Sequence, residues 1–128
     1  MTNTSPSVPA PQDASLPGLG SVGVWRSGTS TSLEPALAGV VERLGYGTLW
    51  IGGSPRADLA IAEALLDASD TLVVSTGIVN IWTAPAEEVA ASFHRIERTH
   101  PGRFVLGIGI GHREAIGDRF EKPYAALV

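Results

Sequence analysis

Arg-Phe-Val-Leu-Gly-Ile-Gly-Ile-Gly-His, residues 103–112, is the stretch of the sequence that decides the fold. It begins as an apolar run and continues with glycine at positions 107, 109 and 111. A short apolar run that follows Pro101-Gly102 predicts a fully buried strand of a parallel sheet. Glycine at alternate positions leaves one face of this strand bare, so a neighbouring backbone or a flat ligand must come close to it.

His112 stands directly after this strand, at its carboxyl end. Parallel α/β folds carry their chemistry at this end, and imidazole titrates near neutral pH, so His112 is the candidate for substrate orientation or proton donation. The alternative interpretation of His112 is a polar residue at a strand end whose side chain bonds to a loop carbonyl. The three histidines, at positions 94, 100 and 112, follow no metal-ligand spacing, and we predict no metal site. The glycine spacing G-x-G-x-G also departs from the dinucleotide-binding fingerprint.

Three further strands are predicted upstream, at residues 21–25, 48–51 and 72–78. Amphipathic helices alternate with them, and the strand starts recur about every 25 to 30 residues, so the strands should pair in parallel. Such units form either a doubly wound sheet or part of an eightfold (β/α) barrel.

The predicted helices have recognisable ends and apolar faces. Thr31 and Glu34 have the spacing of a capping box, and Gly45 is expected to end the first helix. Asp58 is expected to cap the second helix. The residues that form the apolar faces of the first and third helices are Leu33, Leu37, Val40, Val41 and Leu44, then Val89, Phe93 and Ile96.

The two ends of the chain differ from this repeat. Residues 1–19 are rich in Ser, Thr, Pro and Ala, and we predict a disordered tail. Residues 122–128 begin the apolar stripe of a fourth helix, without a terminating signal. We therefore expect the folded part of the chain to begin near residue 20 and the chain to end in the middle of a fold.

The composition excludes several classes of protein. The 128 residues carry a formal net charge of −4 and no basic cluster, which argues against nucleic-acid binding. The absence of cysteine excludes disulfides, thiolate metal sites and thiol nucleophiles. No apolar run reaches the ~20 residues of a membrane span, and no secretory signal opens the chain, so we expect a cytoplasmic protein.

Three motifs occur in order at consistent separations: Leu-Gly-Tyr-Gly-Thr-Leu-Trp at 44–50, Ser-Thr-Gly-Ile-Val-Asn at 75–80, and Pro-Gly-Arg-Phe-Val-Leu-Gly-Ile-Gly at 101–109. Together they resemble the amino-terminal half of luciferase-like flavin and deazaflavin oxidoreductases, most closely the branch that uses deazaflavin coenzyme F-420. The resemblance covers about residues 20–128. It implies a (β/α)8 barrel of the TIM type, of which this chain supplies about the first four βα units.

The resemblance also implies a cofactor site. In the family the coenzyme ring lies across the carboxyl ends of the strands, and a bulge after the third strand, often with a non-prolyl cis peptide, backs the ring. By position this bulge is Gly77-Ile78, while Asn80 matches a polar position near the ring. His112 matches a position facing substrate or ring. Gly52-Gly53-Ser54 stands where some relatives carry an acid and a histidine, so proton donation from that loop is not expected.

Two features of the residues themselves bear on this site. The loop at 52–54 is either an anion-binding nest or a tight turn, and the turn is favoured. Trp25, Trp50 and Trp82 fall near strand carboxyl ends, where they either pack or wall a flat ring. Trp82 is the best candidate for the wall.

The expected function is hydride transfer between deazaflavin coenzyme F-420 and an unidentified small organic substrate. One alternative is a monooxygenase of the same family that uses FMN. Another is a truncated, non-catalytic remnant, or a half-barrel that needs a partner chain. Half a barrel leaves two strand edges bare, so we expect a homo-oligomer or pairing with a complementary half-barrel.

Overall fold

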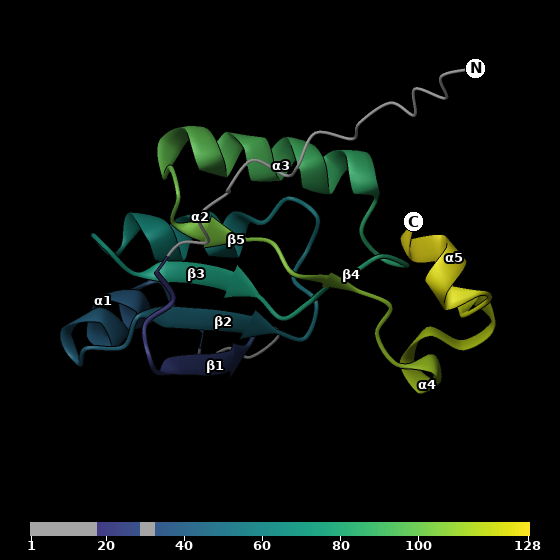
Figure 1. The fold of residues 1–128 in the computed structure, drawn as a ribbon, viewed down its shortest axis with the longest axis horizontal. Coiled ribbons are helices and arrows are strands. Elements are labelled where there is room, and N and C mark those ends of the chain that lie inside the picture. Colours follow the sequence, from purple (N-terminus) through teal and green to yellow (C-terminus); the bar gives the residue numbers. More distant parts are fainter. Residues whose placement is uncertain (1–17, 29–32) are drawn as a thin grey trace, which may run out of the picture.

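The computed structural model describes residues 18–28 and 33–128, so the predicted cap Thr31 lies outside the described residues. Figure 1 shows helices and strands alternating along this part of the chain. The elements in chain order are β1 (Gly23–Ser27), α1 (Ala36–Arg43), β2 (Thr48–Gly52), α2 (Ala60–Asp67), β3 (Val73–Thr76), β4 (Val79–Asn80), α3 (Ala86–Thr99), β5 (Phe104–Val105), β6 (Ile108–Gly109), α4 (Arg113–Ile116), the 3-10 helix η1 (Gly117–Arg119) and α5 (Pro123–Leu127).

The main sheet has four parallel strands in the order β1-β2-β3-β5. Each strand therefore lies beside the next one along the chain, whereas a doubly wound sheet reverses its strand order at a switch point. Sequential order is the arrangement of a (β/α) barrel. The structure thus decides between the two architectures that the repeat allowed, in favour of a partial barrel.

The predicted strands at 72–78 and 103–112 are each divided in two. β3 pairs with β5, and after a break β4 pairs with β6 in a separate two-stranded sheet. The hydroxyl of Thr76 spans the break: it donates to the Gly107 carbonyl and accepts from the Gly107 N–H, both at 2.9 Å. The prediction of one fully buried strand over 103–112 is wrong. Ile108 is 51% exposed, because β6 has a neighbour on one edge only among the described strands.

Gly107, Gly109 and Gly111 form a glycine ladder, and the neighbouring strand occupies the space beside it. A Cβ added at Gly107 would lie 2.1 Å from the carbonyl oxygen of Thr76, and one at Gly111 would lie 2.4 Å from the side-chain nitrogen of Asn80. At Gly109 the nearest atom would be a side-chain carbon of Ile78, at 3.1 Å. Of the two explanations for the bare face, close approach of a neighbouring strand therefore holds along the whole ladder.

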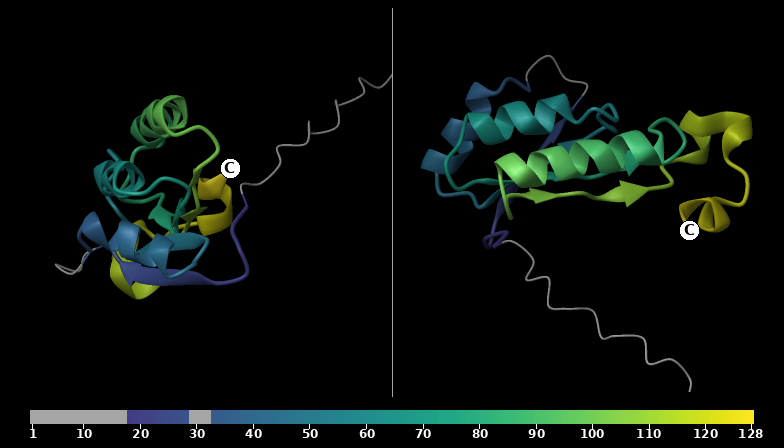
Figure 2. Two further views of the ribbon diagram at one scale, coloured as in Figure 1. Left: turned by 90° about the vertical axis from the view of Figure 1, so that its left-hand side faces the viewer. Right: turned by 90° about the horizontal axis from the view of Figure 1, so that it is seen from above.

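Helices α1, α2 and α3 follow one another along one side of the sheet (Figure 2). Alternate strand residues face them, and the register places Leu49, Val74 and Phe104 side by side in the core between the layers. The largest fully buried side chains of this core include Leu49, Ile51, Leu59, Leu65, Leu66, Leu72, Val74 and Ile96. The opposite face of the sheet is thereby left for the site.

The predicted stripe of the first helix is only partly buried. Val40 and Leu44 are 41% and 70% exposed, whereas the small side chain of Ala38 is fully buried beside Val41. The packed face of α1 is narrower than the predicted stripe and centres on Ala38 and Val41. For the third helix, Val89 and Ile96 are buried as predicted, and Phe93 packs partly against the core.

Two of the predicted helix ends agree with the structure, whereas the predicted capping box does not: α1 begins at Ala36, so Glu34 lies before the helix. Gly45 has φ +87° directly after the first helix, the left-handed conformation of a terminating glycine. The Asp58 carboxylate accepts a hydrogen bond from the N–H of Ala60, the first residue of α2, at 3.1 Å. Residues 122–128 do form a helix, α5, but the preceding α4 and η1 were not predicted.

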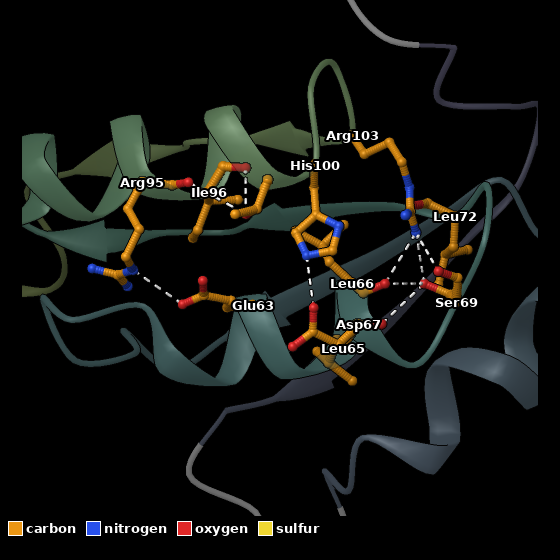
Figure 3. A network of polar contacts seen from close by, with 11 residues as sticks. Glu63, Leu65, Leu66, Asp67, Ser69, Leu72, Arg95, Ile96, His100 and Arg103 are labelled. Carbon is orange, nitrogen blue, oxygen red and sulfur yellow. Dashed lines mark hydrogen bonds and ion pairs between the residues drawn. The ribbon is translucent and has the colours of Figure 1, made fainter.

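Polar contacts fasten the amino end of the sheet, where helices end and strands begin (Figure 3). Arg103 donates to the carbonyls of Leu66, Ser69 and Leu72 and to the Ser69 hydroxyl. The His100 ring nitrogen lies 2.8 Å from the Asp67 carboxylate, so His100 joins α3 to α2 and has a structural role. No helix in the described part of the chain is both long and apolar enough to cross a membrane.

Candidate functional site

A pocket of about 370 Å³ lies at the carboxyl ends of the parallel strands. β1 contributes Trp25 from within the strand, and the other lining residues come from the ends of the later strands or from the segments that follow them. The lining residues are Trp25, Gly53, Ser54, Gly77, Ile78, Asn80, Gly111, His112 and Ala115. In a (β/α) barrel this is the end at which substrates and cofactors bind.

The break between β3 and β4 contributes Gly77 and Ile78 to the pocket. The peptide bond between these two residues is cis. The N–H of Gly77 donates to the Ile51 carbonyl at 2.8 Å, so the break is still attached to β2. The bulge that the family resemblance placed at Gly77-Ile78 is therefore present at that position, next to the pocket.

Asn80 connects three loops around the pocket, and it is only 8% exposed. Its backbone N–H donates to the hydroxyl oxygen of Ser54 at 3.0 Å, and its side-chain oxygen accepts from the N–H of Trp82 at 2.9 Å. Its side-chain nitrogen lies against Gly111, where a Cβ would meet it at 2.4 Å. Asn80 thus fixes the loops after β2, β4 and β6 relative to one another.

Sequence reasoning missed the role of Ser54. Gly53 and Ser54 are consecutive residues with positive φ, +73° and +54°, which makes this loop a tight turn rather than part of the helix that follows. The turn aims the Ser54 hydroxyl at the backbone of Asn80. A Gly-Gly-Ser sequence after a strand signals the turn, but not the partner, which lies 26 positions further along the chain.

Two tryptophans lie differently from the prediction. Trp82 does not line the pocket: its indole N–H donates to the Ile110 carbonyl at 2.9 Å and its ring centroid is 5.9 Å from that of Phe120. Trp25 lines the pocket and is 60% exposed. In register, Trp25 lies opposite Trp50, on the sheet face that the helices do not cover. Strand alternation could have pointed to Trp25, although the sequence prediction preferred Trp82.

His112 lines the pocket from the loop between β6 and α4. Its backbone is extended, with φ −110°, and its carbonyl accepts the N–H groups of Ala115 and Ile116 in the first turn of α4. The residue is exposed to solvent. An exposed imidazole at this place can exchange protons with both a bound molecule and water.

The structure therefore brings together four of the five predicted site residues, Gly77, Ile78, Asn80 and His112, and leaves Trp82 outside. None of the described lining residues is Asp, Glu, Lys or Arg. Within residues 18–28 and 33–128 there is also no group of three or more His, Asp or Glu placed to hold a metal ion. The pocket is thus an uncharged site with one titratable side chain.

Sequential parallel strands with a pocket at their carboxyl ends define the class: a partial (β/α) barrel with a site of the kind that barrel enzymes use. Residues 21–128 match the family described as luciferase-like monooxygenase, and the chain belongs to that family. The family consists of flavin-dependent oxidoreductases, whose cofactor is FMN or coenzyme F-420. A search of curated proteins found no match.

The pocket residues fit the ring of such a cofactor better than its phosphate. Gly53 and Gly77 line the pocket without a Cβ and Ile78 presents apolar surface, which suits a flat ring. Among the described lining residues no Lys or Arg is present to pair with a phosphate. The lining therefore suits a flat ring, while the phosphate would need residues outside this set.

Proposed function

We propose that the chain is part of an oxidoreductase that transfers a hydride between deazaflavin coenzyme F-420 and a small organic substrate. The pocket is the observation that carries this proposal, because all four strand positions converge on it beside Gly77-Ile78. When bound, the deazaflavin supplies the hydride chemistry. The protein residues bind and orient the coenzyme and the substrate, and they donate or accept the accompanying proton.

Each residue then has a separate role. Gly77 and Ile78 present a surface against which the ring rests, and the hydrogen bond from Gly77 to Ile51 holds that surface on β2. Asn80 keeps the surrounding loops in place through its contacts with Ser54 and Trp82. His112, exposed at the pocket, holds or delivers the proton that accompanies hydride transfer to an unsaturated substrate.

The cofactor is tested by titration. Purified protein is titrated with F-420 and, separately, with FMN, while absorbance and fluorescence are followed. We expect F-420 to bind more tightly, and Ile78→Ala to weaken binding, whereas the control Ile61→Ala, on α2, leaves it unchanged. Tighter FMN binding would support the family's monooxygenase alternative. No binding of either cofactor at millimolar concentration would support a non-catalytic remnant.

We also propose that the sheet is completed by a second set of parallel strands. Among the described strands, β1 and β5 each pair with one neighbour only, so they are the two edges of the main sheet. Four more strands would give the eight of a closed barrel. A second copy or a complementary half-barrel meets this need. Size-exclusion chromatography with light scattering should show an assembly, and a stable monomer would contradict the proposal.

A further inference from the structure

Trp25 has one face on the protein and much of its surface in solvent. A Cβ added at Gly52 would lie 1.9 Å from a ring carbon of Trp25, so the indole lies directly against the bare backbone of β2. Trp25 is nevertheless 60% exposed and lines the pocket. Such an arrangement fixes an aromatic ring on glycine and leaves its remaining surface free to contact a ligand.

The packing of the Trp25 ring requires glycine at position 52. Any side chain at position 52 would occupy the space of the Trp25 ring, because three ring atoms lie within 2.6 Å of the added Cβ. Trp50 repeats the pattern one step along the sheet: its indole nitrogen lies 2.9 Å from a Cβ added at Gly23. The sheet face that meets the pocket therefore carries tryptophans laid over glycines of the adjacent strand.

The rest of the lining limits the charge of the ligand. Apart from His112, the described lining residues carry no titratable side chain, and polar side chains come only from Ser54, Asn80 and His112. The side-chain oxygens of Ser54 and Asn80 accept hydrogen bonds from backbone N–H groups, and both side chains are uncharged. A charged substrate would lose its hydration here without a counter-charge, whereas a neutral one would not.

We infer that Trp25 is a specificity-determining residue that stacks on the substrate, and that the substrate is a neutral, planar, conjugated molecule. This inference rests on the proposed function, since it takes the Gly77-Ile78 side of the pocket as the place of the coenzyme ring. Trp25, on β1, is then left for the substrate. Aromatic stacking also orients the conjugated system, so that its position relative to the coenzyme is fixed.

The test uses coumarin, a neutral planar lactone, and its saturated, non-planar counterpart octahydrocoumarin. Binding of each is measured by calorimetry, with and without F-420, for the native protein, Trp25→Ala, Trp25→Phe and Gly52→Ala. Tyr124→Ala removes another exposed aromatic ring, on α5, and serves as the control. Circular dichroism verifies that each variant is folded.

We expect the native protein to bind coumarin about five- to tenfold more tightly than octahydrocoumarin, the size of one aromatic stacking contact. Trp25→Ala should abolish this preference, Trp25→Phe should restore most of it, and Tyr124→Ala should leave it unchanged. Gly52→Ala should also reduce it, because the ring is displaced while remaining in the chain.

The outcomes separate this inference from the proposed function. Coenzyme binding with a coumarin preference that survives Trp25→Ala, or with no preference at all, overturns the inference and leaves the function intact. A preference that depends on Trp25 in a protein that binds no coenzyme supports the stacking role and contradicts the function. Tighter binding of the anion coumarin-3-carboxylate than of coumarin would overturn the conclusion that the substrate is neutral.

Discussion

The two ends of the parallel sheet are built from different chemistry. At the amino end, charged side chains bond to backbone: Arg103 reaches three carbonyls around the end of α2, and Glu42 accepts from the N–H groups of Asp70, Thr71 and Leu72. At the carboxyl end, glycine, serine and asparagine surround an uncharged pocket. Barrel folds separate stability and function in this way, with the chemistry at the carboxyl end.

Because the two ends of the sheet differ, substitutions at each end should affect different properties of the protein. Charge-assisted hydrogen bonds to backbone are strong, so changes at the amino end should lower the free energy of unfolding without altering the pocket. At the carboxyl end the close contacts are between backbones, as at Gly107 and Thr76, and an added side chain there should disturb both stability and the pocket. The exposed residues of the pocket should affect function alone.

Gly107→Ala should have the largest effect. The added Cβ would lie 2.1 Å from the Thr76 carbonyl, and a backbone atom cannot move away as a flexible side chain can. We expect a loss of ~3 kcal/mol or more in the free energy of unfolding, at the upper end of the range for overpacking. Urea denaturation followed by circular dichroism measures it.

Gly109→Ala is the matched control on the same strand pair. Its Cβ would meet only side-chain carbons of Ile78, at 3.1 Å and beyond, and these can shift. The loss should stay below about 1.5 kcal/mol. Equal losses for the two variants would show that the ladder is not shaped by the backbone of Thr76.

Arg103→Met should act at the amino end alone. It removes four hydrogen bonds from one guanidinium and leaves the Ser69 and Leu66 carbonyls without that donor. Because these bonds involve a charged group, we expect a loss of about 2 to 3 kcal/mol. Thermal unfolding measures the loss, with the exposed Arg98→Met as control, which should change stability by less than about 0.5 kcal/mol. Coenzyme binding should be unaffected, and a large change would contradict the separation of the two ends.

Glu42→Gln tests the same end through pH. The backbone hydrogen bond from Thr71, with those from Asp70 and Leu72, lowers the pKa of Glu42 from its ordinary 4.5 to about 2. A carboxylate with a lowered pKa contributes stability above pH 4.5, and this contribution is lost as the pH falls from 4.5 towards 2. For this partly exposed group we expect Gln to cost about 1 kcal/mol at pH 7.

Denaturation midpoints measured between pH 3 and pH 7 provide the check for Glu42. The difference between the native protein and Glu42→Gln should shrink as the pH falls. The exposed Glu88→Gln is the control and should show no such trend. A difference that stays constant across this range would mean that the hydrogen bonds, and not the charge, stabilise the loop before β3.

The sequence predicts the helices and strands better than it predicts their interruptions. Terminating glycine and capping residues act through local backbone conformation, so Gly45 was predicted correctly, and Asp58 bonds to the first N–H of α2 although Leu59 is the residue directly before that helix. The break between β3 and β4 depends on Thr76 bonding to Gly107, a contact across 31 positions, and local pattern contains no sign of it. Periodicity alone therefore predicted one long strand.

Some site residues could be identified from the sequence, and others only from the structure. The ladder of glycines indicated a close approach but left open what approached, because a neighbouring strand and a ligand require the same bare face. The family resemblance located Gly77-Ile78. Which tryptophan lines the pocket could be identified only from the tertiary structure. Trp25 lies within β1 and Trp82 follows β4, and only the structure shows that Trp82 bonds to Ile110 while Trp25 remains exposed at the pocket.

His112→Ala should have the smallest effect on stability and therefore sharpens the comparison most. His112 is exposed, so truncating its side chain should change the free energy of unfolding by less than about 0.5 kcal/mol. If the His112 imidazole transfers the proton during turnover, His112→Ala should lower the rate of the assembled, coenzyme-loaded enzyme about 10²-fold. One limb of the pH–rate profile should disappear as well. The conservative His112→Gln should preserve binding but not the rate. A pH–rate profile that is the same for the native protein and His112→Ala would show that the imidazole takes no part in proton transfer, and that the proton comes from another group or from water.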